Sequence, residues 1–253
     1  MKKLLVAAVA TAALLATAVP AAAITNGVPD DDHDFVGVMR GLDPGGTERQ
    51  CSGSLIADGV FLTAGHCAVL SGVTVHFGDE IEASDPGFKA TKVVRRHPSY
   101  AANFGFQYDV AIALFEQPVD LVIEPGVLAP PNYLDGFSKN QLRAETFYTI
   151  GYGLVRNGAN GNSGPLTESP QRMIATQSYL NMHNQYLGLS IHTHKGNGGG
   201  CFGDSGGPHL LNEMIVSITS NGDGNCVATD NTQRIDQPEI LDWIRGFIPA
   251  EAG

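Results

Sequence analysis

Gly203-Asp204-Ser205-Gly206-Gly207-Pro208 is the segment from which the fold can be argued, because it places a serine between glycines. Glycine permits tight backbone turns, so the Ser205 hydroxyl can stay accessible while nearby N–H groups point into the space beside it. Serine alone is a poor nucleophile and needs a base, which in turn needs an orienting group. Taken alone, the segment is explained equally well as a turn.

Two further segments contain residues that can supply the base and the orienting group. Thr63-Ala64-Gly65-His66-Cys67 places His66 directly after an apolar run, and histidine can take up and return a proton near neutral pH. Asp109 stands at the start of the apolar run 110–114. In isolation, His66 is equally an ordinary surface or core histidine, and Asp109 a turn residue at the entry to a strand.

Together, the three segments resemble the catalytic blocks of the chymotrypsin-like serine proteases, in that family's order of His, Asp and Ser. The resemblance runs from Ile24 to the final helix, through Cys51-Ser52-Gly53-Ser54-Leu55-Ile56, Gly151-Tyr152-Gly153 and Ser220-Asn221-Gly222. It implies two six-stranded antiparallel β-barrels packed together, with the site in the cleft between them. An α/β-hydrolase is disfavoured, because it needs a histidine well downstream of its serine and only His209 follows Ser205.

The resemblance also implies a role for each residue of the site. Ser205 attacks the peptide carbonyl, His66 takes and returns the proton, and Asp109 orients the imidazole. The N–H groups of Gly203 and Ser205 form the oxyanion hole. The segment Ser220-Asn221-Gly222 pairs with the substrate backbone. A homologue that only binds partners is the competing hypothesis, which the complete set of catalytic residues disfavours.

The remaining sequence is typical of an all-β protein that ends in a helix. Short apolar runs separated by Gly, Pro, Asn and Asp predict strands at 35–39, 60–63, 73–77, 91–95, 110–115, 146–152, 187–193 and 214–219. Apolar residues at helical spacing predict a C-terminal helix over about 237–248, with Asp236 as N-cap. We expect a first barrel over about 24–130, a second over about 131–235, and a mobile surface loop at 157–165.

The N-terminus predicts a secretory signal over residues 1–23, with Lys2 and Lys3, an apolar run and then Ala21-Ala22-Ala23. The alternative is a membrane anchor, but the apolar run is short for a span. Cleavage would leave a protease domain over 24–253, secreted and extracellular. In the resembling family a freed Ile or Val terminus pairs with the Asp before the catalytic Ser, which implies activation through Ile24 and Asp204.

Composition limits the partners. The formal net charge is −11, and loss of residues 1–23 would make it −13. Such an acidic chain without a Lys/Arg cluster argues against nucleic acid and, after signal removal, membranes as partners. We expect protein or peptide substrates, protein protease inhibitors as further partners, no cofactor and a monomer.

Four cysteines in a secreted chain allow three pairings. Cys51 with Cys67, and Cys201 with Cys226, would each close a short loop, worth about 3 kcal/mol per bridge. A zinc site is the other interpretation, but close Cys/His ligand spacing is missing. Secretion favours the two disulfides.

The sequence says least about which substrate side chain the primary pocket accepts. The resemblance places Gly199, Gly200 and Gly222 at the primary pocket, and small residues there favour an apolar or aromatic substrate side chain. The alternative is a preference for Lys or Arg, if Asp230 reaches the pocket floor. His192 and His194 lack a third ligand for a metal site. The acidic residues Asp79, Glu80, Glu82 and Asp85 are better explained as a solvated turn than as a calcium site.

Overall fold

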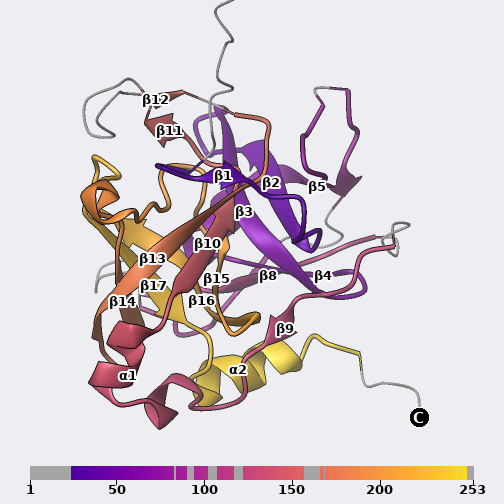
Figure 1. Cartoon of the computed structure of the whole chain (residues 1–253). Coiled ribbons are helices and arrows are strands. Elements are labelled where there is room, and N and C mark those ends of the chain that lie inside the picture. The colour runs from indigo at the N-terminus through magenta and orange to yellow at the C-terminus, as the bar shows by residue number, and fades with distance from the viewer. Residues whose placement is uncertain are drawn as a thin grey trace, which may run out of the picture.

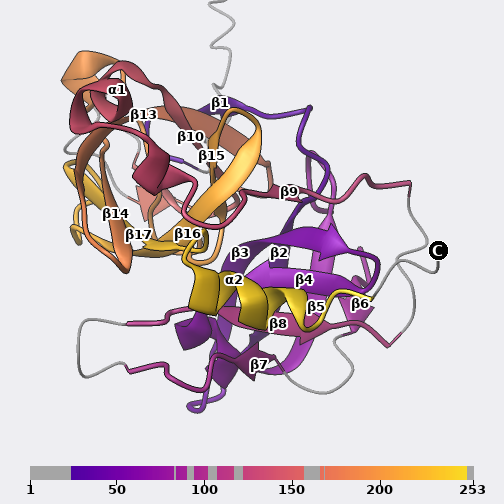
Figure 2. The same cartoon turned by 90° about the horizontal axis from the view of Figure 1, so that it is seen from below.

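The structure is a computed structural model that describes residues 24–82, 84–89, 94–101, 107–116, 122–156, 166–167 and 169–249. The predicted signal segment 1–23 and the predicted loop 157–165 lie outside the described residues. The regular secondary structure of the described chain is mostly β, and its two large sheets lie side by side (Figures 1 and 2). Among the described helices, none has the length and apolar character needed to cross a membrane.

The first sheet is a curled half-barrel built from the N-terminal part of the chain. Among the described residues, its strands follow the order β6-β5-β2-β3-β4-β8-β7, and each pairs with its neighbours in that order. Their bounds are β2 Val36–Leu42, β3 Glu48–Ala57, β4 Val60–Thr63, β5 Ser71–Phe77, β6 Phe88–Lys89, β7 Arg95–Arg96 and β8 Ala111–Leu114.

The second sheet closes into a six-stranded barrel. Its strands run β10-β15-β16-β17-β14-β13, and β13 pairs back with β10. Their bounds are β10 Phe147–Gly151, β13 Met173–Met182, β14 Tyr186–Ser190, β15 Pro208–Leu211, β16 Met214–Gly222 and β17 Thr229–Arg234. Two short strands join it from outside, β1 (Val28–Pro29) on β13 and β9 (Val127–Leu128) on β16, and a separate ribbon is formed by β11 (Val155–Arg156) and β12 (Leu166–Thr167).

These sheets confirm the predicted all-β class, two-barrel arrangement and C-terminal helix, α2, over Pro238–Arg245. The predicted N-cap is wrong. The carboxylate of Asp236 instead accepts a hydrogen bond from the Leu134 N–H and pairs with Arg234, so the helix begins after Gln237 with a proline in its first turn. A second helix, α1 (Lys139–Ala144), was not predicted, since it is too short for its periodicity to be recognised.

One hydrophobic cluster fixes the two sheets relative to each other. It combines Val38 and Leu62 of the first sheet, Ile150 and Ile218 of the barrel, and Ile240 of α2, all fully buried. Burying each such side chain contributes about 1.5–3 kcal/mol. Because the same core is shared, the loops of both sheets hold constant positions where they meet.

Candidate active site

The pairing of β4 with β8 brings His66 next to Asp109. Thr63, the last residue of β4, lies opposite Ala111, the first residue of β8. The chain after β4 therefore continues beside the chain before β8, and these two stretches contain His66 and Asp109.

Asp109 is fully buried and binds His66 twice. One carboxylate oxygen accepts the backbone N–H of His66 at 2.8 Å, and the other contacts Nδ1 of its imidazole at 2.8 Å. The second oxygen also accepts a hydrogen bond from the Ser220 hydroxyl at 2.6 Å. An imidazole held this way carries its proton on Nδ1 and leaves Nε2 available as a base.

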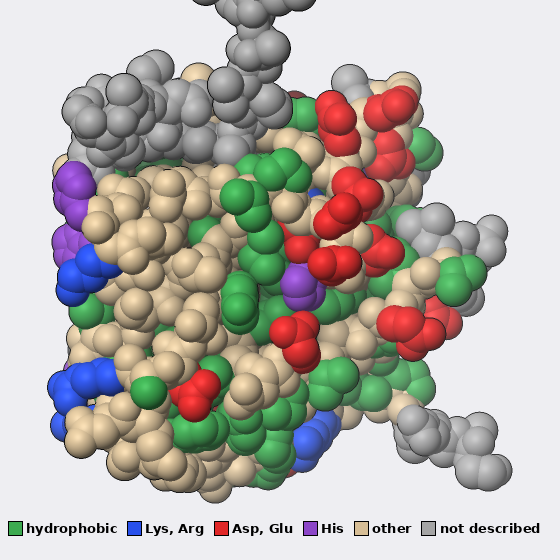
Figure 3. All heavy atoms as spheres, in the orientation of Figure 1, with side chains coloured by type: hydrophobic (Ala, Val, Ile, Leu, Met, Phe, Trp, Pro, Cys, Tyr) green, Lys and Arg blue, Asp and Glu red, His purple; other side chains and the backbone are tan. Residues whose placement is uncertain are grey.

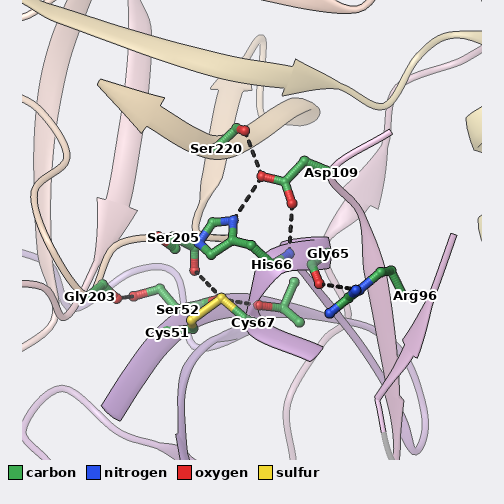
Figure 4. Close-up of a disulfide and its surroundings, with 11 residues drawn as sticks. Cys51, Ser52, Gly65, His66, Cys67, Arg96, Asp109, Gly203, Ser205 and Ser220 are labelled. Atoms are coloured by element: carbon green, nitrogen blue, oxygen red, sulfur yellow. Dashed lines mark hydrogen bonds and ion pairs between the residues drawn. A yellow bond between two sulfur atoms is a disulfide. The ribbon is translucent and has the colours of Figure 1, made fainter. Parts of the chain in front are cut away.

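Two supports hold the His66 segment (Figure 4). The disulfide Cys51–Cys67 joins β3 to the residue after His66. Arg96 donates through Nε to the carbonyl of Gly65 at 2.8 Å. The Cys51 and Cys67 sulfur atoms lie near His66, but they are bonded to each other and therefore are not thiolate ligands for a metal.

Ser205 reaches this pair from the barrel. Its carbonyl accepts the N–H of Ser52 on β3 at 2.9 Å, and the next residue, Gly206, donates to the Thr219 carbonyl at 2.8 Å. Gly206 has φ of +84°, and a Cβ there would overlap Thr63 and the Ala64 N–H, so only glycine fits. Figure 4 shows Ser205 beside the His66 imidazole, and both line the same cavity.

Backbone donors also converge on Ser205. Within the described chain, the N–H groups of Gly203 and Ser205 donate to no protein acceptor. Gly203 has φ of +99°, which a non-glycine residue adopts only under strain. Free N–H groups beside a serine hydroxyl form a site for a developing oxyanion.

The comparisons with known proteins agree with this geometry. The family model described as Trypsin matches residues 24–244. The chain belongs to the trypsin family. It is accordingly a serine protease with a chymotrypsin-like fold.

Individual relatives of this trypsin-family protease are distant. Trypsin 5G1 of Aedes aegypti is 27% identical over 235 residues, which cover 86% of this chain and 81% of that protein. Coagulation factor IX of Cavia porcellus is 26% identical over 181 residues, 66% of this chain, and this chain spans only 60% of its length.

Two solved structures show the same fold. HL collagenase has a TM-score of 0.69 at 18% identity, over 90% of this chain and 96% of that one. The structure of GrC has a TM-score of 0.68 at 18% identity, over 87% and 97%. At this identity the similarity concerns the fold alone.

A cavity of about 270 Å³ opens beside Ser205 in this trypsin-family protease. Its lining includes the predicted substrate-binding residues Gly200, Ser220, Asn221 and Gly222, and both cysteines of the second disulfide, Cys201–Cys226. The structure thus forms both predicted disulfides. Gly199 lies behind the cavity wall, where it pairs with Thr25.

Asp230 also lines this cavity, from β17. It is 2% exposed, and its Oδ2 accepts hydrogen bonds from the Gly200 N–H at 3.2 Å and from Gln177 at 3.0 Å. Among the described residues, Oδ1 accepts no hydrogen bond. One oxygen of a carboxylate in the cavity is therefore left for a ligand.

Ile24 and Asp204 are both fully buried. Ile24 packs with Met173 and Ala175, and the Asp204 carboxylate accepts the N–H groups of Gly153 and Cys201 at 2.8 Å each. Burial raises the pKa of Asp204 well above its usual range, against the effect of those two hydrogen bonds. An unpaired carboxylate in this position would be stabilised by a cation.

The other candidate residues are not gathered into a site. Asp79 binds Arg172 at 2.7 Å, and Asp85 binds His76 at 3.0 Å. His192 and His194 are exposed near a one-turn helix. Sequence reasoning missed Gln233, whose side chain accepts the N–H of Asp109 at 2.9 Å, because no motif marks a glutamine in a polar strand.

Proposed function

We propose that this protease is an endopeptidase in which Ser205, His66 and Asp109 form the catalytic triad. The observation that carries the proposal is the double contact of buried Asp109 with His66, beside Ser205. Ser205 Oγ attacks the peptide carbonyl while His66 Nε2 takes its proton, and the leaving amine receives that proton. Water then hydrolyses the acyl-enzyme through the same base.

The N–H groups of Gly203 and Ser205 stabilise the negative charge that develops on the carbonyl oxygen. They support this role because they have no protein acceptor among the described residues. Loss of one such donor typically costs about 10²–10³ in kcat.

For the primary pocket, the position of Asp230 favours cleavage after Lys or Arg over cleavage after apolar residues. A buried carboxylate lines the cavity, and one of its oxygens accepts no hydrogen bond from the described residues, so a basic side chain would supply both a charge and donors to it. The glycines of the wall, Gly200 and Gly222, leave room for such a long side chain.

Activation follows from the burial of Ile24 and Asp204. Cleavage before Ile24 would create an ammonium group, and pairing with that group would stabilise the Asp204 carboxylate. Signal removal would then release the active domain 24–253 outside the cell. Its partners would be peptide or protein substrates and protein inhibitors, and it would act as a monomer.

The test uses the purified chain that begins at Ile24, with casein and with peptide anilides that end in Arg, Lys, Leu or Phe. We expect hydrolysis that Ser205→Ala abolishes while its circular dichroism and melting temperature stay unchanged. Activity retained by Ser205→Ala would overturn the triad. No activity in the parent chain would favour the non-catalytic homologue, and faster cleavage after Leu or Phe would favour an apolar pocket.

A further inference from the structure

A buried polar cluster lies in the barrel behind the cavity, and the catalytic mechanism does not use it. It consists of Gln177 on β13, His209 on β15, Thr219 on β16 and Asp230 on β17, each at most 5% exposed. Buried polar groups are costly unless they are hydrogen-bonded, so such a cluster needs a reason.

Its hydrogen bonds run in one direction toward Asp230. His209 Nδ1 lies 2.8 Å from Oε1 of Gln177, and Nε2 of the amide of Gln177 donates to Oδ2 of Asp230 at 3.0 Å. Since the amide oxygen only accepts, Nδ1 of His209 carries the proton. The other ring nitrogen, Nε2, then accepts the Thr219 hydroxyl at 2.9 Å.

Asp230 and His209 together determine which way the Gln177 amide faces. A glutamine side chain can turn by 180° and exchange its oxygen for its NH2 group. With the opposite orientation, the Gln177 oxygen would face the Asp230 carboxylate and its NH2 group would face the His209 N–H. The contact with the acceptor-only carboxylate would be repulsive, and the contact with His209 would be favourable only after its proton moved to Nε2. The observed orientation satisfies both neighbours, so the His209 Nδ1–H stabilises the orientation in which Gln177 donates to Asp230.

The space at Gly199 belongs to the same arrangement. A Cβ on Gly199 would overlap the side chains of Ile191 and Gln177. The Ile191 methyl and the Gln177 amide therefore occupy the place where a side chain of residue 199 would start. The carboxylate in the cavity comes from β17, and Gln177 donates a hydrogen bond to it.

His209 is suited to this role because it stays uncharged. Burial lowers its pKa, although the nearby charge of Asp230 acts in the opposite direction. Among the residues that the structure describes, Asp230 is the only charged side chain paired with it, at 3.8 Å from Nε2. A neutral ring orients Gln177 without neutralising the carboxylate that a basic substrate would need.

We propose that His209 and Gln177 are positioning residues that hold the Asp230 carboxylate toward a basic substrate side chain. This inference rests on the proposed role of Asp230 in the pocket, and it explains what keeps the Asp230 carboxylate in place. Its effect belongs to substrate preference and not to the chemistry at Ser205.

The test compares kcat/KM for an Arg anilide with kcat/KM for a Leu anilide, each normalised to active sites titrated with a fluorophosphonate. We expect Asp230→Asn to lower the Arg:Leu ratio about 10–100-fold, the range for loss of a charge-assisted hydrogen bond. His209→Leu and Gln177→Met should each lower it about tenfold, with the Leu anilide changed less than threefold. In the Asp230→Asn background, His209→Leu should leave the ratio unchanged.

Binding of benzamidine, a small aromatic cation, to the Ser205→Ala variant gives the same comparison without catalysis. His209→Leu should weaken benzamidine about tenfold. The matched control is Thr232→Val, which also removes a buried polar group of the barrel. The Thr232 hydroxyl bonds to Leu187 and Ser217 and not to Asp230.

The outcomes separate the two proposals. If Asp230→Asn leaves the ratio and benzamidine binding unchanged, the proposed basic preference is wrong and the inference falls with it. If Asp230→Asn lowers both but His209→Leu and Gln177→Met do not, only the inference is wrong. An equal loss for both anilides, or the same loss in Thr232→Val, would also overturn it, since it would show a general structural effect.

Discussion

Asp109 is the residue on which the geometry of the site depends most. Its buried carboxylate accepts hydrogen bonds from the His66 backbone, the His66 ring and Ser220, and its own N–H donates to Gln233. A buried charge is stable only when it is bonded in this way. These contacts therefore stabilise the fold and hold the imidazole in one tautomer.

Asp109→Asn should lower kcat about 10⁴-fold, because the amide can donate to Nδ1 and so favours the wrong tautomer of His66. The measurement is steady-state hydrolysis of a peptide anilide near neutral pH. Ser220→Ala is the control, since it removes one hydrogen bond to Asp109 and keeps the carboxylate. A kcat for Asp109→Asn within tenfold of the parent would contradict the assignment.

The buried carboxyl group of Asp204 should make the free energy of unfolding depend on pH in the chain that is not cleaved before Ile24. Its pKa is raised in the folded state by burial, so the folded chain binds the proton more tightly than the unfolded chain. Stability therefore falls as pH rises from about 4, the ordinary pKa, toward the folded value.

We expect Asp204→Asn to raise the melting temperature of the uncleaved chain at neutral pH and to leave it nearly unchanged at about pH 3. In the chain that begins at Ile24, the same substitution should remove most activity, because the ammonium loses its partner. Thermal unfolding at both pH values tests this, and an equal shift at both would contradict it.

Among the elements, β17 shows what sequence patterns do not reveal. All six of its residues, Thr229–Arg234, are polar, yet Asp230, Thr232, Gln233 and Arg234 are buried. Short apolar runs predicted β4 and β8 closely, since nearly all of their side chains are buried in the core. A strand whose buried side chains are polar is recognised only when its partners are known, and those partners come from distant segments.

The helix α1 is stabilised at its start by a capping box. Ser138 accepts the N–H of Gln141, and the Gln141 side chain accepts the N–H of Ser138 in return. Ser138→Ala should lower the free energy of unfolding by about 1 kcal/mol. Chemical denaturation measures this, and kcat/KM should stay unchanged because α1 lies on the barrel away from the cavity lining (Figure 2). A loss above 2 kcal/mol would mean that Ser138 has a further role.

Over the whole molecule, the site exists because two sheets meet. His66 and Asp109 lie in connections between strands of the first sheet, Ser205 lies just before β15 of the barrel, and Ser220 lies in β16. Motifs predicted these residues and the fold, because the family pattern is local in the sequence. The sequence left the position of Asp230 as one of two alternatives, and its support by Gln177 and His209 could not be predicted, since both depend on the register of the barrel strands.

Arg172 also joins the two parts of the molecule. It is fully buried just before β13 and binds Asp30 and Asp34 of the N-terminal segment and Asp79 beyond β5. On the face of the molecule in Figure 3, most of the acidic side chains gather on one side. Burial acts to raise the pKa of Asp30, but His33 and Arg172 outweigh it and lower the pKa.

Arg172→Met should destabilise the protein by about 3 kcal/mol at neutral pH, because Asp30 loses one of its two partners and keeps His33. The lowered pKa of Asp30 gives stability above about pH 4, the unfolded value, and this stability is lost as pH falls through the folded value. The difference between parent and variant should therefore shrink in acid. Urea unfolding at several pH values tests it, and a difference independent of pH would contradict it.

The central claim is that Ser205 is the nucleophile and His66 its base. The most direct measurement is peptide mapping by mass spectrometry after treatment of the chain that begins at Ile24 with a fluorophosphonate. We predict one adduct, on Ser205, whose formation parallels the loss of hydrolysis and which is absent in His66→Ala. Inhibition with an adduct on another residue, or hydrolysis that continues with Ser205 fully modified, would contradict the account.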